Sequence, residues 1–228
     1  MRKNIILFDM DNTLLLGDTV MLWAQFLDKK RLMSESDWKK RRQFDEDYAE
    51  HRLDIAASFE FDFSLIRKIP LAQRIAWRSD FFDSMVKAKI SNTGLRLIRE
   101  YKNDPHNIVV LITATHRFLA SPIAEYSGVH DLIATEAEIK GDYTGRTLGV
   151  INMGEGKVKN LKSWIHKNDL EPDYTVLYSD SINDLPLLSY VEKPIAVDPD
   201  RHLKTIALEK KWEIISFRGN NVKIAICT

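Results

Sequence analysis

The chain has 228 residues, which fits one large domain or a domain with an insertion, and this length can bury enough surface to fold without disulfides or metal. Its 33 basic and 33 acidic side chains cancel, which excludes a strong electrostatic footprint for nucleic acid or an anionic membrane, and 44% hydrophobic residues exclude global disorder. Cys227 is the single cysteine, so an intramolecular disulfide is excluded, as suits a reducing compartment.

The beginning of the chain carries too short an apolar run for a targeting segment. Four apolar residues at positions 5–8 lie between a basic pair and two aspartates. A signal peptide needs about 7–15 apolar residues and a membrane helix about 20. The longest aliphatic run, residues 108–112, has five. We therefore expect a cytoplasmic protein with no membrane partner.

A first strand at residues 4–8 is followed by a long stretch that we expect to be helical. No glycine lies between Asp18 and Thr93, and Pro70 is the single proline there. Because glycine and proline mark turns and breaks, their scarcity predicts helices. The predicted helices cover residues 19–27, residues 35–50 behind a capping box of Ser34 and Asp37, a face made by Ile55, Phe59, Phe63 and Ile66, and residues 70–88 starting at Pro70.

The rest of the chain alternates between apolar runs and helical patterns. Strands are predicted at residues 107–112, 175–178 and 194–197, helices at 93–101, 117–127, 157–167 and 201–211, and a hairpin turn at 141–145. This alternation predicts an α/β fold with a three-layer, Rossmann-like parallel sheet. We expect residues 1–16 and 88–228 to form this core and residues 17–87 to form an inserted α-helical cap over the sheet edge.

Each predicted strand ends at a polar cluster, and carboxylates dominate two of these clusters. Asp9 and Asp11 follow the first strand in DMDNT, and Asp180 and Asp184 follow a later one in SDSIND. In open α/β sheets the ligand lies at the carboxyl ends of the strands, so these groups should meet. Two like charges at ~4 Å repel by about 4 kcal/mol at a dielectric constant near 20. Hard oxygen ligands of this kind favour Mg²⁺.

Lys157 and Thr113 complete a site suited to phosphate. Four carboxylates, one Mg²⁺, one lysine and one retained proton would leave a neutral site that accepts a dianionic phosphate. The Thr113 hydroxyl could hold phosphate oxygens. An aspartate can attack phosphorus to form an aspartyl-phosphate, and a second carboxyl group two residues on can protonate the leaving alkoxide and then activate water.

DMDNT, Thr113 in LITAT, Lys157 and SDSIND match, in order and spacing, the four motifs of the haloacid dehalogenase superfamily. The inserted helical region resembles the cap of its phosphoserine-phosphatase-like branch, and the resemblance covers roughly residues 1–216. It implies a phosphatase with Asp9 as nucleophile and Asp11 as general acid and base. An aspartate at position 11 favours phosphatases over dehalogenases.

The same resemblance implies the binding residues. Mg²⁺ would be held by the Asp9 carboxylate, the Asp11 backbone carbonyl and Asp180, with Asp184 in support. Thr113 and Lys157 would bind phosphate, and Asn183 is a further candidate for phosphate or substrate binding.

The chain departs from the usual motifs at three places, and the third suggests a substrate contact. Ser179 stands where the family usually has glycine, and we expect little effect there. The second motif continues as Ala114, Thr115 and His116 instead of a glycine-rich segment. Asp18 lies nine residues after Asp9, where phosphoserine phosphatases carry a glutamate that contacts the substrate amine.

Several of these residues also have plain structural interpretations. Asp18 can cap the helix that starts at Thr19, His116 can be a helix-start or pocket-edge residue, and the tryptophans Trp23, Trp38 and Trp77 can pack the helices of the insertion. Residues 29–50 contain seven basic and six acidic side chains, which indicates a salt-bridged helix face and no nucleic-acid patch.

Two classes of function remain at this point. The favoured one is a Mg²⁺-dependent phosphomonoesterase for a small metabolite, with phosphoserine or histidinol phosphate as amine-bearing substrates, and with phosphotransfer open beside hydrolysis. The remote alternative is a non-enzymatic phospho-acceptor switch, which also gathers aspartates, a threonine and a lysine around Mg²⁺. Against it, the acidic pair follows the first strand and a helical insertion encloses the site. The oligomeric state stays open.

Overall fold

The computed structural model describes residues 2–50 and 52–219, so Cys227 lies outside the described part of the chain. Within it, seven strands form one sheet in the order β4-β3-β2-β1-β5-β6-β7. All neighbours pair in parallel except β3 and β4. The predicted α/β class with a parallel core is therefore confirmed. The strands are β1 (Arg2–Phe8), β2 (Asn107–His116), β3 (Asp131–Lys140), β4 (Asp142–Leu148), β5 (Glu171–Ser179), β6 (Lys193–Val197) and β7 (Glu213–Ile215).

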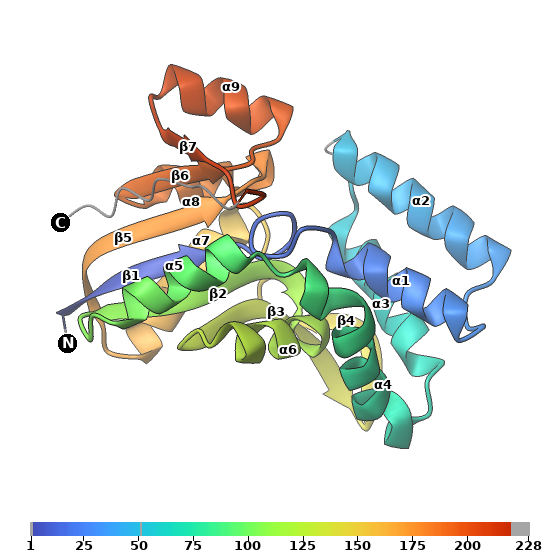
Figure 1. Cartoon of the computed structure of the whole chain (residues 1–228). Helices are drawn as coiled ribbons and strands as arrows, with labels where there is room; N and C mark the ends of the chain where they lie inside the picture. The colour runs from blue at the N-terminus through green and yellow to red at the C-terminus, as the bar shows by residue number, and fades with distance from the viewer. Residues whose placement is uncertain (1, 51, 220–228) are drawn as a thin grey trace.

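Helices cover both faces of the sheet (Figure 1). Alternate residues of β1 enter two different apolar clusters, since Ile5 and Leu7 belong to one and Ile6 and Phe8 to the other. The first cluster includes side chains of α7 (Glu155–Lys167), α8 (Leu185–Tyr190) and α9 (Arg201–Glu209). The second includes side chains of α5 (Asn92–Lys102) and α6 (Arg117–Ser127). The core thus has three layers, because side chains alternate across each strand.

The inserted stretch is helical, as predicted, and its helices begin at capped positions. Asp18 caps α1 (Thr19–Lys29), Ser34 and Asp37 form the predicted capping box of α2 (Glu35–Ala49), and Asp54 caps α3 (Ile55–Arg67). Each side-chain oxygen accepts a hydrogen bond from a backbone N–H in the first turn, which would otherwise lack a partner.

The prediction of one helix from Pro70 to residue 88 is wrong. The chain instead forms a 3₁₀ turn at Leu71–Gln73, α4 (Arg74–Phe81), a π-helical turn at Phe82–Val86 and another 3₁₀ turn at Lys87–Lys89. Phe81 and Val86 lie five residues apart and are both buried. A π turn, whose hydrogen bonds span five residues, helps bring such a pair to the same side.

The helices of the insertion pack directly on the core. Phe63 of α3 stacks on Tyr143 of β4 with ring centroids 5.3 Å apart. Trp23 of α1 is buried and meets Phe118 of α6 edge-on at 6.0 Å. These contacts join the apolar side chains of the insertion to the cluster on one face of the sheet. The division into a core and a cap at residues 17 and 87 stays a prediction.

The edges of the sheet differ most from the sequence-based prediction. β3, β4 and β7 and the short α8 were not predicted. The hairpin turn was placed at residues 141–145, but the chain reverses at Gly141 alone, which has a φ of 77°, while Asp142 and Gly145 already belong to β4. Glycine suits this position because it adopts positive φ without steric cost. No helix among the described residues is both long and apolar enough to span a membrane.

Gly156 is predicted to be intolerant of a side chain. A Cβ atom there would lie 1.9 Å from the carbonyl oxygen of Ile151, whereas at Gly219 it would meet nothing within 4 Å. We expect Gly156→Ala to lower the free energy of unfolding by about 1–3 kcal/mol, because the backbone must shift, and Gly219→Ala to change it by less than about 0.5 kcal/mol. Urea denaturation of both variants checks this, and equal stability of the two would contradict the packing at Gly156.

Candidate active site

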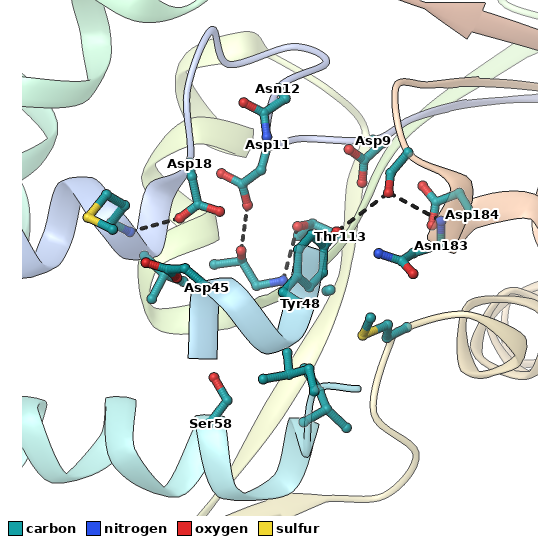
Figure 2. Close-up of a pocket in the computed structure, with 18 of the residues that line it drawn as sticks. Asp9, Asp11, Asn12, Asp18, Asp45, Tyr48, Ser58, Thr113, Asn183 and Asp184 are labelled. Atoms are coloured by element: carbon teal, nitrogen blue, oxygen red, sulfur yellow. Dashed lines mark hydrogen bonds between the residues drawn. The ribbon is translucent and has the colours of Figure 1, made fainter. Parts of the chain in front are cut away.

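Three neighbouring strands deliver side chains to one cavity. Asp9 directly follows β1, Asp180 directly follows β5, and Thr113 lies in β2, so the central strand and its two neighbours all contribute. The cavity has a volume of about 430 Å³. Every predicted site residue lines it, and many are labelled in Figure 2: Asp9, Asp11, Asp18, Thr113, Lys157, Asp180, Asn183 and Asp184.

The sequence suggested that Thr113 lies at the end of a strand. In the structure it lies inside β2. β2 continues to His116, but its pairing with β3 is interrupted between Ile112 and His116. Thr113 and Thr115 are two residues apart and both line the cavity. Interruptions of this kind re-aim side chains near active sites.

A buried lysine joins two of the aspartates. Lys157 Nζ lies 2.7 Å from Asp9 Oδ1 and 2.7 Å from Asp184 Oδ2, and all three side chains are almost fully buried. Burial alone would lower the lysine pKa, but the charges of Asp184 and Asp9 raise it above its usual value. Lys157 is therefore a fixed positive charge, and it lies in the first turn of α7 directly after Gly156.

Asp11 is held apart from this ion pair. Its Oδ1 accepts hydrogen bonds from the backbone N–H of Thr19, at 2.7 Å, and from the Thr19 hydroxyl. Its Oδ2 accepts a hydrogen bond from the Thr115 hydroxyl at 2.6 Å. Burial, followed by the charge of Asp18, raises the pKa of Asp11 to about 7. A carboxyl group with such a pKa can both donate and accept a proton near neutrality.

A threonine and a serine fix the carboxylates of the last motif. The Thr13 hydroxyl donates to Asp180 Oδ1 at 3.0 Å and accepts from the Asp180 backbone N–H, which joins loops 167 positions apart. The Ser179 hydroxyl donates to Asp184 Oδ2 at 2.7 Å. The Ser179 side chain thus contacts a site carboxylate, which the sequence did not indicate, and the small effect expected of this residue stays a prediction.

The donor set suits a divalent cation. Burial raises the pKa of Asp9 to about 6. Burial, followed by the charge of Asp9, raises the pKa of Asp180 to about 8. The one lysine does not balance the charge of these neighbouring carboxylates. Among the described residues, no three Asp, Glu, His or Cys side chains converge as a ready-made metal cluster. Mg²⁺ keeps several waters and needs only one or two protein carboxylates, so Asp9 and Asp180 could hold it with the Asp11 carbonyl.

Residues from the insertion complete the cavity and were not identified from the sequence. Arg41, Asp45 and Tyr48 of α2 and Ser58 and Asp62 of α3 line it. The (i, i+4) spacing of Arg41 and Asp45 was visible within the predicted salt-bridged face, but nothing in the sequence indicated that this pair points inward. Asp62 has no oppositely charged residue four positions away, so its ion pair could not be predicted from the sequence.

Asp18 caps a helix and also lines the cavity, and its contact with a substrate amine stays a prediction. Its Oδ1 accepts the backbone N–H of Met21 at 2.8 Å and so caps α1, while the side chain also lines the cavity. His116 is instead a helix-start residue at α6, buried outside the cavity, and burial lowers its pKa to about 3.

Comparison with known proteins agrees with this geometry. The profile of the haloacid dehalogenase-like hydrolases matches residues 6–189. A histidinol-phosphatase of Neisseria meningitidis is 32% identical over 222 residues, covering 95% of this chain and 100% of the relative. A solved structure of a Bordetella pertussis protein of unknown function has a TM-score of 0.87 and 31% identity, covering 95% of this chain and all of that chain. A substrate-bound phosphoserine phosphatase shares the fold, with a TM-score of 0.67, 20% identity and 96% and 94% coverage.

The raised carboxyl pKa values predict how stability depends on pH and metal. With their raised pKa values, Asp11 and Asp180 keep protons in the metal-free folded chain up to about pH 7 and pH 8, whereas the unfolded chain loses them near the ordinary value of 3.8. The folded state therefore binds more protons in this window, and the free energy of unfolding should fall as pH rises through it. Mg²⁺ at about 100 times its dissociation constant should add about 2.7 kcal/mol at pH 8.

Thermal unfolding at pH 5.5 to 8, with EDTA or with Mg²⁺, measures both effects. Asp180→Asn should weaken the stabilisation by Mg²⁺, and the matched control Asp83→Asn, at an exposed position in the insertion, should keep it. Equal stabilisation of both variants by Mg²⁺ would contradict the donor set.

Proposed function

The chain belongs to the haloacid dehalogenase-like hydrolases and is a phosphatase of that family, and from this premise we propose that it hydrolyses small phosphate monoesters through a phosphorylated Asp9, with Mg²⁺ as cofactor. The observation that carries the proposal is the convergence of Asp9, Asp11, Lys157 and Asp180 on one cavity. An enclosed cavity with a separate acid–base group supports an enzyme over a phospho-acceptor switch.

The first step forms a bond between an Asp9 carboxylate oxygen and phosphorus. The bond from phosphorus to the ester oxygen breaks, and the leaving alkoxide takes the proton of Asp11. With a pKa of about 7, Asp11 holds that proton in a substantial fraction of molecules at neutral pH. Thr19 and Thr115 keep this carboxyl group in place through hydrogen bonds to both of its oxygens.

The second step returns the enzyme to its starting state. Asp11, now ionised, takes a proton from water, and the resulting hydroxide attacks phosphorus. The bond between phosphorus and Asp9 breaks, and inorganic phosphate leaves. Lys157 stabilises negative charge beside Asp9 throughout, and Thr113 can donate to a phosphate oxygen. Bound Mg²⁺ would supply further charge stabilisation on the transferring phosphoryl group.

The leaving group lies on the side of the cavity that the insertion lines. Asp18 can meet an amine there, so an amine-bearing substrate such as phosphoserine fits the proposal. Histidinol phosphate is the alternative, and the name of the Neisseria meningitidis relative supports it. Both substrates place a cation within a few bonds of the phosphate ester.

Loss of the nucleophile should abolish turnover. Asp9→Asn should lower kcat for p-nitrophenyl phosphate by more than about 10³-fold, because the amide cannot form the covalent intermediate. EDTA should abolish phosphate release by the wild-type protein, and added Mg²⁺ should restore it. The exposed Asp83→Asn serves as control and should retain wild-type turnover. Metal-independent turnover, or full turnover by Asp9→Asn, would refute the proposal.

Replacement of Asp11 should separate the two steps. Asp11→Asn should lower kcat by about 10²–10⁴-fold, because neither the leaving group nor the attacking water has its proton-transfer partner. An activated ester such as p-nitrophenyl phosphate needs less protonation, so the phosphorylated intermediate should accumulate with it. Intact-protein mass spectrometry after acid quench should detect one added phosphoryl group on Asp11→Asn. Absence of this group from the double variant that also carries Asp9→Asn would assign the phosphorylation to Asp9.

A further inference from the structure

The cavity has a second end, away from the nucleophile, that three helices of the insertion build. Asp18 precedes α1, Asp45 lies on α2, and Ser58 and Asp62 lie on α3. In Figure 2, Asp18, Asp45 and Ser58 lie on the side away from Asp9 and Asp184. Because Asp9 must approach phosphorus, the rest of a bound ester extends toward this end.

Arg41 is the cation that could have bound a substrate carboxylate here, but it is already occupied. Its Nε donates to Asp45 Oδ1 at 3.1 Å, and its Nη1 donates to Asp62 Oδ1 at 3.1 Å. The Arg41 side chain is 6% exposed, and the Asp62 side chain is 5% exposed. Breaking such a buried pair costs about 3–5 kcal/mol, so Arg41 does not turn to a ligand easily.

The lining charges are strongly unequal. Among the described residues, seven aspartates line the cavity against two cationic side chains, Lys157 and Arg41, so anions outnumber cations even where the raised pKa values of Asp11 and Asp180 leave these two protonated. Lys157 is held by Asp9 and Asp184, as Arg41 is by Asp45 and Asp62. A leaving group with its own carboxylate would therefore meet anions and no available cation, and like-charge contacts of this kind oppose binding.

Ser58 adds an acceptor that has no partner. The residue is 6% exposed, its hydroxyl points into the cavity, and it makes no side-chain hydrogen bond within the described part of the chain. Asp18 Oδ2 and Asp45 Oδ2 also accept no hydrogen bond there, since Met21 and Arg41 use the other oxygen of each. These residues thus offer three open acceptors from three elements to one cavity, and a primary ammonium has three N–H donors.

We propose that this end of the cavity selects phosphate esters whose leaving group carries a primary ammonium and no carboxylate, with Asp45 and Ser58 as specificity-determining residues beside Asp18. Arg41 is a positioning residue that holds Asp45 and does not bind substrate. Met21, Ile55 and Phe59 also line the cavity and give the carbon chain an apolar contact. This inference rests on the proposed phosphatase activity and narrows it to amino-alcohol phosphates, so that of the two amine-bearing substrates named above it favours histidinol phosphate over phosphoserine.

A series of esters tests the selection on the wild-type protein. Phosphoethanolamine and 3-aminopropyl phosphate are compared with O-phosphoserine and O-phosphohomoserine, which add one carboxylate each, and with the N-acetylated amines, which lack the cation. L-histidinol phosphate adds a ring-bearing amino alcohol, and p-nitrophenyl phosphate reports the chemistry alone. Phosphoethanolamine and 3-aminopropyl phosphate each have one carboxylate partner and one N-acetylated partner in this series. For whichever of the two amines is the better substrate, we expect kcat/KM to be at least about 100-fold higher than for either of its partners.

Two variants and a matched control locate the selection. Asp45→Asn and Ser58→Ala should lower the ratio of kcat/KM for the preferred amine over p-nitrophenyl phosphate, by about 10–100-fold and about 3–10-fold respectively. Asp45→Asn also leaves Arg41 with one carboxylate partner, so discrimination against the phosphoserine carboxylate should shrink. Glu46→Gln removes the same charge from an exposed position on the same helix and should keep the wild-type ratio.

The outcomes separate this inference from the activity on which it rests. If the wild-type protein hydrolyses p-nitrophenyl phosphate through Asp9 but prefers phosphoserine or neutral esters to their amine counterparts, the selection is refuted and the phosphatase remains. If Asp45→Asn and Glu46→Gln change the ratio equally, Asp45 is not a specificity residue. If no ester releases phosphate, the proposed function and this inference fail together.

Discussion

The pairing of one buried lysine with two buried aspartates is the interaction on which the site depends. Taking an ion out of water costs several kcal/mol, so the buried carboxylates of Asp9 and Asp184 depend on Lys157, which contacts both of them. That lysine reaches them because α7 begins close against Ile151. The packing there leaves no room for a side chain at position 156, which glycine occupies. The local packing of this helix start thereby places a positive charge beside Asp9, the proposed nucleophile.

The parallel sheet explains why residues so far apart in sequence meet. β1 is central, and its neighbours β2 and β5 end at the same edge, so their terminal side chains converge. Thr13 then connects the loops after β1 and β5 through two hydrogen bonds with Asp180. The strands supply coarse position, and these short polar contacts fix the orientation of each carboxylate.

This division also explains what the sequence could and could not predict. Apolar runs ending in Asp9 and Asp180 predict both the sheet and the catalytic edge, because the register of parallel strands leaves little choice. The side-chain contact of Ser179 was missed because a hydroxyl in place of glycine carries no periodic signal. Arg41, Asp45 and Asp62 were missed because their meeting depends on how α2 packs against α3, which no spacing within one helix specifies.

The two ends of the cavity are coupled through charge. After burial, the charge of Asp18 is the largest influence that raises the pKa of Asp11, so the residue proposed to face the leaving group also affects the protonation of the proposed acid. A cation seated against Asp18 would offset that charge and lower the pKa of Asp11, whereas a dianionic phosphate would raise it. A substrate that carries both charges should therefore shift the pKa of Asp11 less than one that carries phosphate alone, which suits the proton transfer proposed for this residue.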